Sequence, residues 1–254
     1  MELLHHDTVQ TIKNRQRLLN NKNLLLWYRK LYQLQFAGLG DISNKVILEI
    51  GSGTSPLKMF YKNVLTSDLM DLDHLDYNFD CQMIDKFELI KDHSIDIISL
   101  TNVLHHLKDP IAFLIKANSK LKSDGLIIML EPYFSFLSAI IYKYLHHEPV
   151  IFDIDKPMLS EIKGPLSSAN MAIPYLIFFS TKDWAKKLEA YYKFSKKDIF
   201  YYSSLSYMIT GGISRRIPLP FSLYNYFHKL DNWLAQKLPH LFAAYFIIKL
   251  RRRG

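Results

Sequence analysis

VILEIGSGT, residues 46–54, joins a short apolar run to a Gly-x-Gly turn. An apolar run of this length that ends at glycine predicts a buried parallel strand. Gly51 and Gly53 lack a Cβ, so the backbone of this turn can pass close to a nucleotide-like ligand. Residues 57–61 can form a short helix after the turn. An ordinary strand-to-helix turn has the same pattern, so this stretch alone leaves both interpretations open.

The segments that follow this turn alternate between strand-like and helix-like patterns. Strands are predicted at residues 64–68, 79–84, 95–100 and 126–130, and an amphipathic helix at 110–121. Alternation of this kind predicts an α/β sheet whose strands are joined by helical crossovers.

The flanking regions are predicted mainly from the helical spacing of their apolar residues. Residues 8–36 read as helical, and residues 147–180 contain four prolines and no obvious long element. Thr181 is a candidate N-cap for one of the later helices. The remaining predictions are helices at 134–146, 181–191 and 222–238 and strands at 199–206 and 242–250.

Polar residues follow three of the predicted strands. Asp68 ends the second strand, where a carboxylate can accept hydrogen bonds from both hydroxyls of a ribose, although it could equally cap a turn. Asp85 follows the third strand and could accept from an adenine amine or be an ordinary loop aspartate. His105 and His106 follow the fourth strand. Adjacent histidine side chains diverge and no third ligand has a metal-like spacing, so no metal site is predicted.

Five motifs follow one another in order over residues 44–132. They are VILEIGSGTSP, TSDLMD, MIDKF, DIISLTNVLHHLKDP and LKSDGLIIMLEP. This pattern resembles the class I S-adenosylmethionine-dependent methyltransferases, specifically those of methyltransferase type 11. The resemblance implies a Rossmann-like, seven-stranded, mostly parallel sheet with helices on both faces. It also implies that the last strand, residues 243–250, inserts antiparallel between its neighbours. Ser55 departs from the pattern, because a third glycine is common there.

The resemblance also implies which residues bind S-adenosylmethionine. Glu49 would orient the glycine loop, and Asp68 would hold the ribose while Leu69 packs against the adenine. Thr101 and Asn102 would border the methionine and sulfonium end, and the two residues after the third strand would read the adenine. The full set of predicted cofactor-binding residues is Glu49, Gly51, Ser52, Gly53, Asp68, Leu69, Ile84, Asp85, Thr101 and Asn102.

Methyl transfer from a sulfonium is an in-line displacement, so the protein mainly positions the nucleophile and excludes water. The favoured reaction is O-methylation of a small molecule, a glycan or a lipid-linked acceptor. A hydroxyl nucleophile usually needs a base, and the candidates are His105, His106 and Glu131. The histidines could instead only line the pocket.

We expect a single domain over residues 1–254. Its predicted parts are an N-terminal helical extension (1–41), the cofactor-binding core (42–132), a lid-like insertion (133–180) and the completion of the sheet (181–254). A non-catalytic cofactor-binding or membrane-associated protein is an alternative. A nicotinamide-dependent oxidoreductase is disfavoured, because the third glycine of G-x-G-x-x-G is missing.

The positive charge of the chain is unevenly placed. The formal net charge is +8, and residues 160–254 hold 15 Lys and Arg against 5 Asp and Glu. This excess suggests an anionic partner such as a membrane surface, or simply a solvated basic surface. The basic residues interleave with apolar positions, which argues against nucleic acid. Arg215, Arg216 and Arg251–Arg253 are the first to test.

The single cysteine, Cys81, fits a reducing compartment. No apolar stretch approaches the roughly 20 residues of a spanning helix. The sequence therefore predicts a cytoplasmic protein that could touch the inner face of a membrane.

Overall fold

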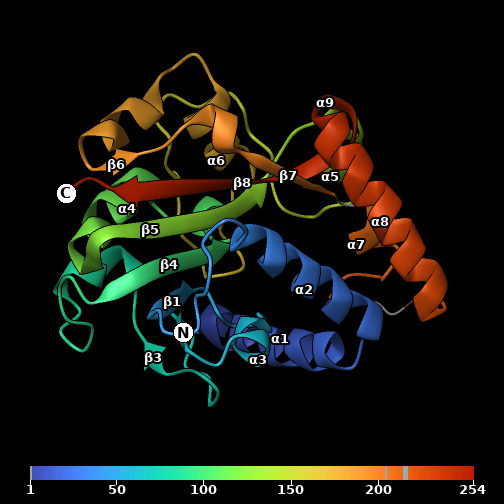
Figure 1. The fold of residues 1–254 in the computed structure, drawn as a ribbon, viewed down its shortest axis with the longest axis horizontal. Helices are drawn as coiled ribbons and strands as arrows, with labels where there is room; N and C mark the ends of the chain where they lie inside the picture. Colours follow the sequence, from blue (N-terminus) through green and yellow to red (C-terminus); the bar gives the residue numbers. More distant parts are fainter. Residues whose placement is uncertain (1, 204, 214–216) are drawn as a thin grey trace.

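A computed structural model describes residues 2–203, 205–213 and 217–254, and within these ranges eight strands form one sheet (Figure 1). The order across the sheet is β3-β2-β1-β4-β5-β8-β6, and β7 also pairs with β8. The strands are β1 (Ile47–Ile50), β2 (Val64–Asp68), β3 (Tyr77–Asn78), β4 (Ile95–Thr101), β5 (Leu121–Pro132), β6 (Tyr192–Lys193), β7 (Phe200–Ser203) and β8 (Ala243–Arg252).

The pairing confirms the predicted topology. Strands β1 to β5 are parallel, and β8 runs antiparallel to β5, with Leu130 opposite Ile247. On its other side β8 pairs with β7 through its first half and with β6 through its last residues. Because β6 and β7 share one place beside β8, the sheet has seven positions in the part of the chain that is described.

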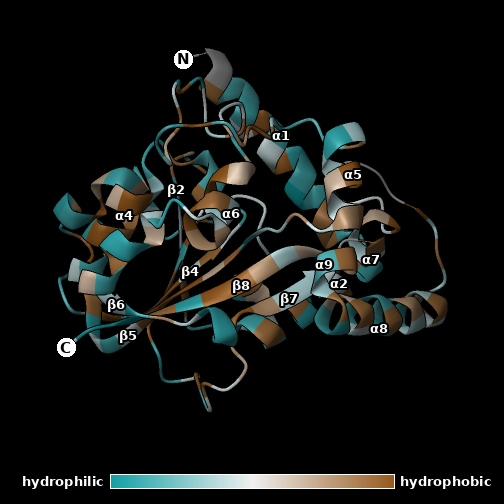
Figure 2. Cartoon of the chain, turned by 90° about the horizontal axis from the view of Figure 1, so that it is seen from above, coloured by the Kyte–Doolittle hydropathy of each residue, from teal (hydrophilic) through white to brown (hydrophobic). Residues whose placement is uncertain are grey.

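Helices cover both faces of the sheet, as predicted. Along β5, Leu126, Ile128 and Leu130 belong to one core cluster, and Ile127 and Met129 belong to the other. The strands β4 and β8 are largely hydrophobic (Figure 2). The helices are α1 (Glu2–Leu19), α2 (Lys22–Gln35), α3 (Leu57–Phe60), α4 (Pro110–Ala117), α5 (Phe136–Tyr144), α6 (Ala172–Phe179), α7 (Leu205–Met208), α8 (Phe221–Lys237) and α9 (Pro239–Phe242). Five short 3₁₀ helices are η1 (Cys81–Lys86), η2 (Leu104–His106), η3 (Asn118–Lys120), η4 (Trp184–Ala190) and η5 (Lys196–Asp198), counted within the described ranges.

The predicted third strand at residues 79–84 is wrong. The strand β3 has two residues and ends before this range, and from Cys81 onward the range belongs to η1. The side chain of Asp80 accepts a hydrogen bond from the backbone N–H of Gln82 at 2.9 Å and so begins the 3₁₀ turn. An N-terminal cap of this kind competes with strand pairing.

Two helix predictions also need correction, and one helix was not predicted. Residues 8–36 form two helices rather than one, because the side chain of Asn21 caps α2. Residues 184–190 form a 3₁₀ helix that starts after Asp183, not after Thr181. The helix α6 lies in the region expected to be irregular. Its proline, Pro174, is in the first turn, where the missing N–H has no intrahelical partner to lose.

The parallel strands bring their carboxyl ends to one edge of the sheet. Ile50, Asp68 and Thr101 end β1, β2 and β4, and the end of β5 pairs with the beginning of β8. In open α/β sheets ligands bind at this edge. The helices α5 and α9 flank the same end of β8, since α5 contacts both α9 and β8.

Candidate active site

The glycine turn after β1 has a backbone that other residues would strain. Gly51 has a φ of +74°, and a Cβ built there would lie 2.4 Å from Cγ2 of Val103. The N–H of Gly53 donates to Oδ2 of Asp68 at 2.9 Å, and the N–H of Met70 donates to Oδ1 at 3.0 Å. Burial raises the pKa of Asp68. The loop and the end of β2 are thus joined through one carboxylate.

Glu49 is buried directly before this turn. Its Oε1 accepts from the hydroxyl of Ser55 at 2.5 Å, and its Oε2 accepts from the hydroxyl of Ser52 at 2.8 Å. Burial raises the pKa of Glu49 to about 7. Ser55 is also hydrogen-bonded to the hydroxyl of Tyr32 at 2.8 Å. Ser55, which stands where the motif commonly has a third glycine, therefore anchors the carboxylate of Glu49 and connects it to α2.

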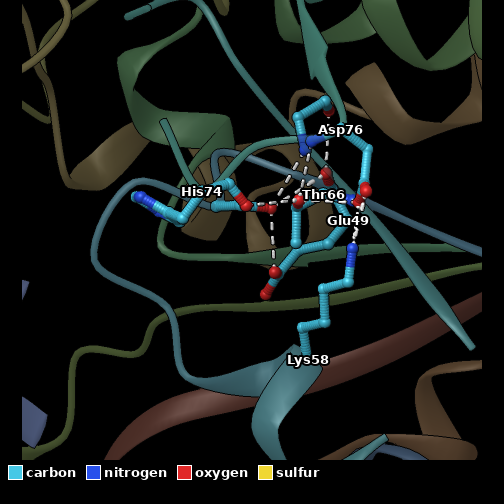
Figure 3. A network of polar contacts seen from close by, with 7 residues as sticks. Glu49, Lys58, Thr66, His74 and Asp76 are labelled. Atoms are coloured by element: carbon cyan, nitrogen blue, oxygen red, sulfur yellow. Dashed lines mark hydrogen bonds and ion pairs between the residues drawn. The ribbon is translucent and has the colours of Figure 1, made fainter. Parts of the chain in front are cut away.

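A polar network fixes β2 beside the glycine turn (Figure 3). Asp76 accepts from both the N–H and the hydroxyl of Thr66, at 2.7 and 2.8 Å, and from Nζ of Lys58. The hydroxyl of Ser67 donates to the backbone carbonyl of Glu49 at 2.8 Å. These bonds hold the strand that carries Asp68 in register with β1.

The helix α1 lies across the glycine turn, which the sequence analysis did not anticipate. Asp7, Thr11 and Arg15 are spaced by four residues and so share one face of the helix. Nη1 of Arg15 donates to the carbonyl of Ser55 at 2.6 Å, and Thr11 donates to the sulfur of the methionine that follows β2. The carboxylate of Asp7 accepts from the N–H of Leu166 at 3.0 Å. The four-residue spacing of these three polar side chains is a signal in the sequence that could have identified this face of α1.

The end of β4 supplies an unpaired polar atom. Asn102 has a φ of +56°, and its N–H donates to the carbonyl of Leu130 at 2.9 Å. Its side-chain Oδ1 is buried and has no hydrogen-bond partner. The neighbouring Thr101 accepts from Nε2 of Gln35 at 3.3 Å. A buried acceptor without a partner fits a site whose ligand carries a donor.

Glu131, at the end of β5, is fully buried and accepts three hydrogen bonds. Its Oε1 accepts from the N–H groups of Val103 and Leu104 at 3.0 and 2.6 Å, and its Oε2 contacts Nδ1 of His105 at 2.6 Å. Nε2 of His105 lies 3.3 Å from Oε2 of Glu148. Burial lowers the pKa of His105, but the two carboxylates outweigh burial and raise it to about 10. His105 is therefore held as a cation at neutral pH.

His106 has the opposite character. Its Nδ1 is hydrogen-bonded to the carbonyl of Ser168 at 2.8 Å, and its Nε2 lies 3.9 Å from Oε1 of Glu148. Burial and the neighbouring cation of His105 lower the pKa of His106 to about 4. The rings of the two histidines approach to 4.2 Å between centroids. The expectation that adjacent histidine side chains diverge is thus wrong here.

The segment 145–171, part of the predicted lid, packs onto the residues after β4. The N–H of Asn170 donates to the carbonyl of His105 at 3.0 Å, and the N–H of Leu159 donates to the carbonyl of Lys108 at 2.9 Å. Through the contacts of Ser168 and Glu148 with the histidines, the segment covers the end of β4. Whether it moves when a ligand binds stays a prediction.

The predicted adenine-side residues are less closely assembled. Ile84 is fully buried in the core, so only its backbone could reach a ligand. Asp85 lies 3.8 Å from Nζ of Lys116, and Leu69 is 46% exposed. The structure therefore brings together most of the predicted site residues at the ends of β1, β2, β4 and β5. The residues predicted to contact the adenine are not assembled with them. The residues that sequence reasoning missed are Asp7, Thr11, Arg15, Tyr32, Gln35 and Glu148.

The sequence matches a family model described as a methyltransferase domain over residues 15–162, more than half of the chain. The chain belongs to the methyltransferase-domain family. As a methyltransferase of this kind, the protein uses S-adenosylmethionine as its cofactor. No curated protein matches the sequence significantly.

Solved structures of S-adenosylmethionine-dependent methyltransferases are similar to this methyltransferase. One from Archaeoglobus fulgidus is 15% identical and has a TM-score of 0.48, with 91% of this chain and 94% of that chain covered. One from Thermotoga maritima is 13% identical, with a TM-score of 0.49 and coverage of 95% and 99%. One from Mesorhizobium loti is 13% identical, with a TM-score of 0.46 and coverage of 87% and 97%.

The residues of this methyltransferase fit S-adenosylmethionine. Gly51 has no side chain, so the backbone of the turn can lie close to the cofactor. Asp68 offers a carboxylate at the end of β2. The unpaired Oδ1 of Asn102 and the carboxylate of Glu49 would face the cationic methionine end. The bound cofactor supplies an activated methyl group on a sulfonium, and the protein orients it and keeps water away.

The conformation of Gly51 leads to a stability prediction for the methyltransferase. We expect Gly51→Ala to lower the free energy of unfolding by about 2–3 kcal/mol, because the new Cβ meets Val103 and because a positive φ disfavours alanine. Gly38→Ala is a matched control, since Gly38 has a φ of +79° and open space around its Cβ position. It should lose only the cost of the positive φ, about 1 kcal/mol. Urea denaturation of both variants measures the difference, and equal losses would contradict the steric explanation.

Proposed function

We propose that this methyltransferase transfers a methyl group to a hydroxyl oxygen of a lipid-linked acceptor while docked on an anionic membrane surface. The proposal selects one of the acceptor classes that the sequence left open. The observation that carries it is an exposed apolar face on α5 and α8.

The helix α8 is apolar on its outward side, whereas its inward side is mixed. Tyr224, His228, Asp231 and Ala235 are buried against the rest of the protein. The opposite side is exposed, with Tyr226 at 71% and Trp233 at 56%. This outward stripe consists of Leu223, Tyr226, Leu230 and Trp233. Exposed aromatic and aliphatic side chains at helical spacing are typical of helices that lie in a membrane interface.

The helix α5 has an exposed apolar stripe of its own. Phe136, Ile140 and Tyr144 are exposed and spaced by four residues. The helix α9 contacts both α5 and α8, and the three helices lie at one end of the molecule (Figure 1). We call the exposed apolar residues of α5 and α8 together the apolar face. The exposed lysines Lys143 and Lys229 lie on the same helices, and basic residues beside an apolar surface favour anionic lipids.

The arginines first chosen from the sequence lie elsewhere. Arg251 and Arg252 are at the far end of β8, where they donate to the carbonyls of Asp124 and Leu121. Arg215 and Arg216 lie outside the described residues. Arg251 and Arg252 therefore lie away from the apolar face, which is the better target for a test.

No helix in the described part of the chain is long and apolar enough to cross a bilayer. We place the protein in the cytoplasm, at the inner face of the membrane, in keeping with its single cysteine.

His106 is the best placed of the three base candidates. Glu131 is occupied by three donors, and both nitrogens of His105 are engaged by carboxylates. The Nδ1 of His106 is fixed by the carbonyl of Ser168, which leaves a lone pair on Nε2. An acceptor hydroxyl beside Nε2 would give it a proton as the oxygen attacks the methyl group.

Membrane docking can be tested with vesicles. We expect the double variant Leu230→Ser/Trp233→Ser to partition at least about tenfold less onto vesicles with anionic lipid, since each buried apolar side chain is worth about 1.5–3 kcal/mol. Leu89→Ser is the control, because Leu89 is 72% exposed in the loop after η1 and lies outside the apolar face. Sedimentation of the three proteins measures the partition. Equal binding of the double variant and the unaltered protein would contradict the proposal.

The acceptor class is tested separately. Incubation with methyl-labelled S-adenosylmethionine and a cell extract should place the label in the lipid-extractable fraction as a methyl ether. Label confined to the aqueous fraction would favour a small-molecule or glycan acceptor. Cofactor binding without transfer to any fraction would favour the non-catalytic alternative.

A further inference from the structure

We propose that His105, His106 and Glu148 bind one divalent transition-metal ion, of which zinc is the best candidate. The three side chains come from η2 and from the segment that follows α5. Their donor atoms lie within 4.8 Å of one another. This inference goes beyond the proposed acceptor and is independent of it.

The orientation of both imidazoles is the strongest argument. Nδ1 of His105 is held by Glu131 at 2.6 Å, and Nδ1 of His106 is held by the carbonyl of Ser168 at 2.8 Å. Histidines that bind metals almost always have their other ring nitrogen fixed by a carboxylate or a backbone carbonyl. Here each histidine has one of these two partners, and both Nε2 atoms are directed to Glu148.

The distances also suit an ion. Nε2 of His105 lies 3.3 Å from Oε2 of Glu148, and Nε2 of His106 lies 3.9 Å from Oε1. Ligands of a tetrahedral zinc ion, each at about 2.0–2.1 Å from the metal, are separated from one another by about 3.3 Å. The first distance already matches this separation, and all three donors lie within 4.8 Å of one another, so they would have to draw closer around an ion.

The donor set indicates the type of metal. Two imidazole nitrogens and one carboxylate oxygen suit zinc and similar ions, whereas magnesium and calcium prefer oxygen ligands alone. Two histidines and one glutamate would leave a fourth position open, as in catalytic zinc sites. His105 is nearly inaccessible, while Glu148 and His106 are partly exposed, so the open position would face their side.

Metal binding would change the chemistry of this group. The ion would replace the proton between His105 and Glu148, which is released to solvent. An oxygen of a ligand at the open position, either water or a hydroxyl, would then bind to the ion and lose its proton more easily. His106 would serve as a ligand in this state rather than as a free base.

A buried ion pair without metal is the competing explanation. The cation of His105 between Glu131 and Glu148 would then only tie the segment after α5 to the core. This explanation predicts no specific binding of zinc, so direct binding measurements separate the two.

The experiment uses tag-free, full-length protein stripped with a chelator and titrated with Zn²⁺. We expect one equivalent to bind and to raise the melting temperature. Co²⁺ should give the intense visible absorption of a tetrahedral site. His106→Gln and Glu148→Gln should lose at least about 100-fold in affinity, given that removing even an outer-shell partner costs up to about 100-fold.

His147→Gln is the matched control, because His147 is an exposed neighbour of Glu148 outside the three-residue cluster. It should bind like the unaltered protein. Circular dichroism without metal checks that each variant is folded. Absence of stoichiometric binding would overturn the proposal. So would unchanged binding in Glu148→Gln, which would place the ion elsewhere, for example at the exposed His5 and His6. No acceptor or methyl transfer enters these measurements, so an incorrect acceptor would not affect them.

Discussion

Glu131→Ala is expected to lower the free energy of unfolding by about 3–5 kcal/mol. The change leaves the buried N–H groups of Val103 and Leu104 without an acceptor and removes the carboxylate that faces His105. Removing one partner of a buried charged pair costs about 3–5 kcal/mol, and unpaired buried donors add to that cost. Urea denaturation followed by circular dichroism measures the loss.

Glu131→Gln is the graded control for this prediction. The amide oxygen can still accept from the two backbone N–H groups, so only the charge opposite His105 is lost. We expect a loss smaller than that of the alanine variant, because both backbone N–H groups keep an acceptor and Glu148 still faces His105. If the alanine variant does not fold, the glutamine variant still reports on the site. Losses below 1 kcal/mol in both variants would show that Glu131 does not organise the turn after β4.

Asp68→Ala is expected to weaken the binding of S-adenosylmethionine by about 100- to 10,000-fold. Two hydrogen bonds from ribose hydroxyls to a carboxylate would be lost, each worth about 1.5–3 kcal/mol. Isothermal titration calorimetry measures the affinity. Unaltered affinity would refute the assignment of Asp68 to the ribose.

Asp68 also holds the N–H groups of Gly53 and Met70, so a loosened loop could weaken binding by itself. A double-mutant cycle separates the two effects. An S-adenosylhomocysteine analogue without ribose hydroxyls should bind the unaltered protein much less tightly than S-adenosylhomocysteine does. In Asp68→Ala the two ligands should bind equally. If the ribose hydroxyls contribute as much to the affinity in the variant as in the unaltered protein, the carboxylate only stabilises the loop and does not bind the ribose.

The sequence predicted the elements whose signals are local. The strand at residues 64–68 agrees with β2 at both ends, and the run that ends at Gly51 locates β1. Buried parallel strands are short and rich in apolar residues, so their pattern can be recognised without knowledge of their neighbours. The strand expected at 79–84 failed because its apolar residues serve a 3₁₀ turn, which the local cap at Asp80 begins.

Contacts between distant segments could not be predicted in this way. Glu148 meets His105 and His106 only because the segment after α5 folds back over the end of β4. Likewise, the spacing of Asp7 and Arg15 marks one face of α1, but nothing in the sequence says that Leu166 lies against it. The motif residues were therefore predictable, whereas the side chains that close the site were not.

The position of β8 has a consequence for how the chain folds. This strand follows the other seven in the sequence of the described sheet, yet it lies inside that sheet, between β5 and the pair β6 and β7. Until residues 243–252 leave the ribosome, β5 has an open edge, and such edges tend to recruit other chains. Its pairing with β5 is also a long-range contact, which slows folding. We therefore expect the sheet of a nascent chain to remain incompletely folded until β8 has been synthesised, and to depend on chaperones until then.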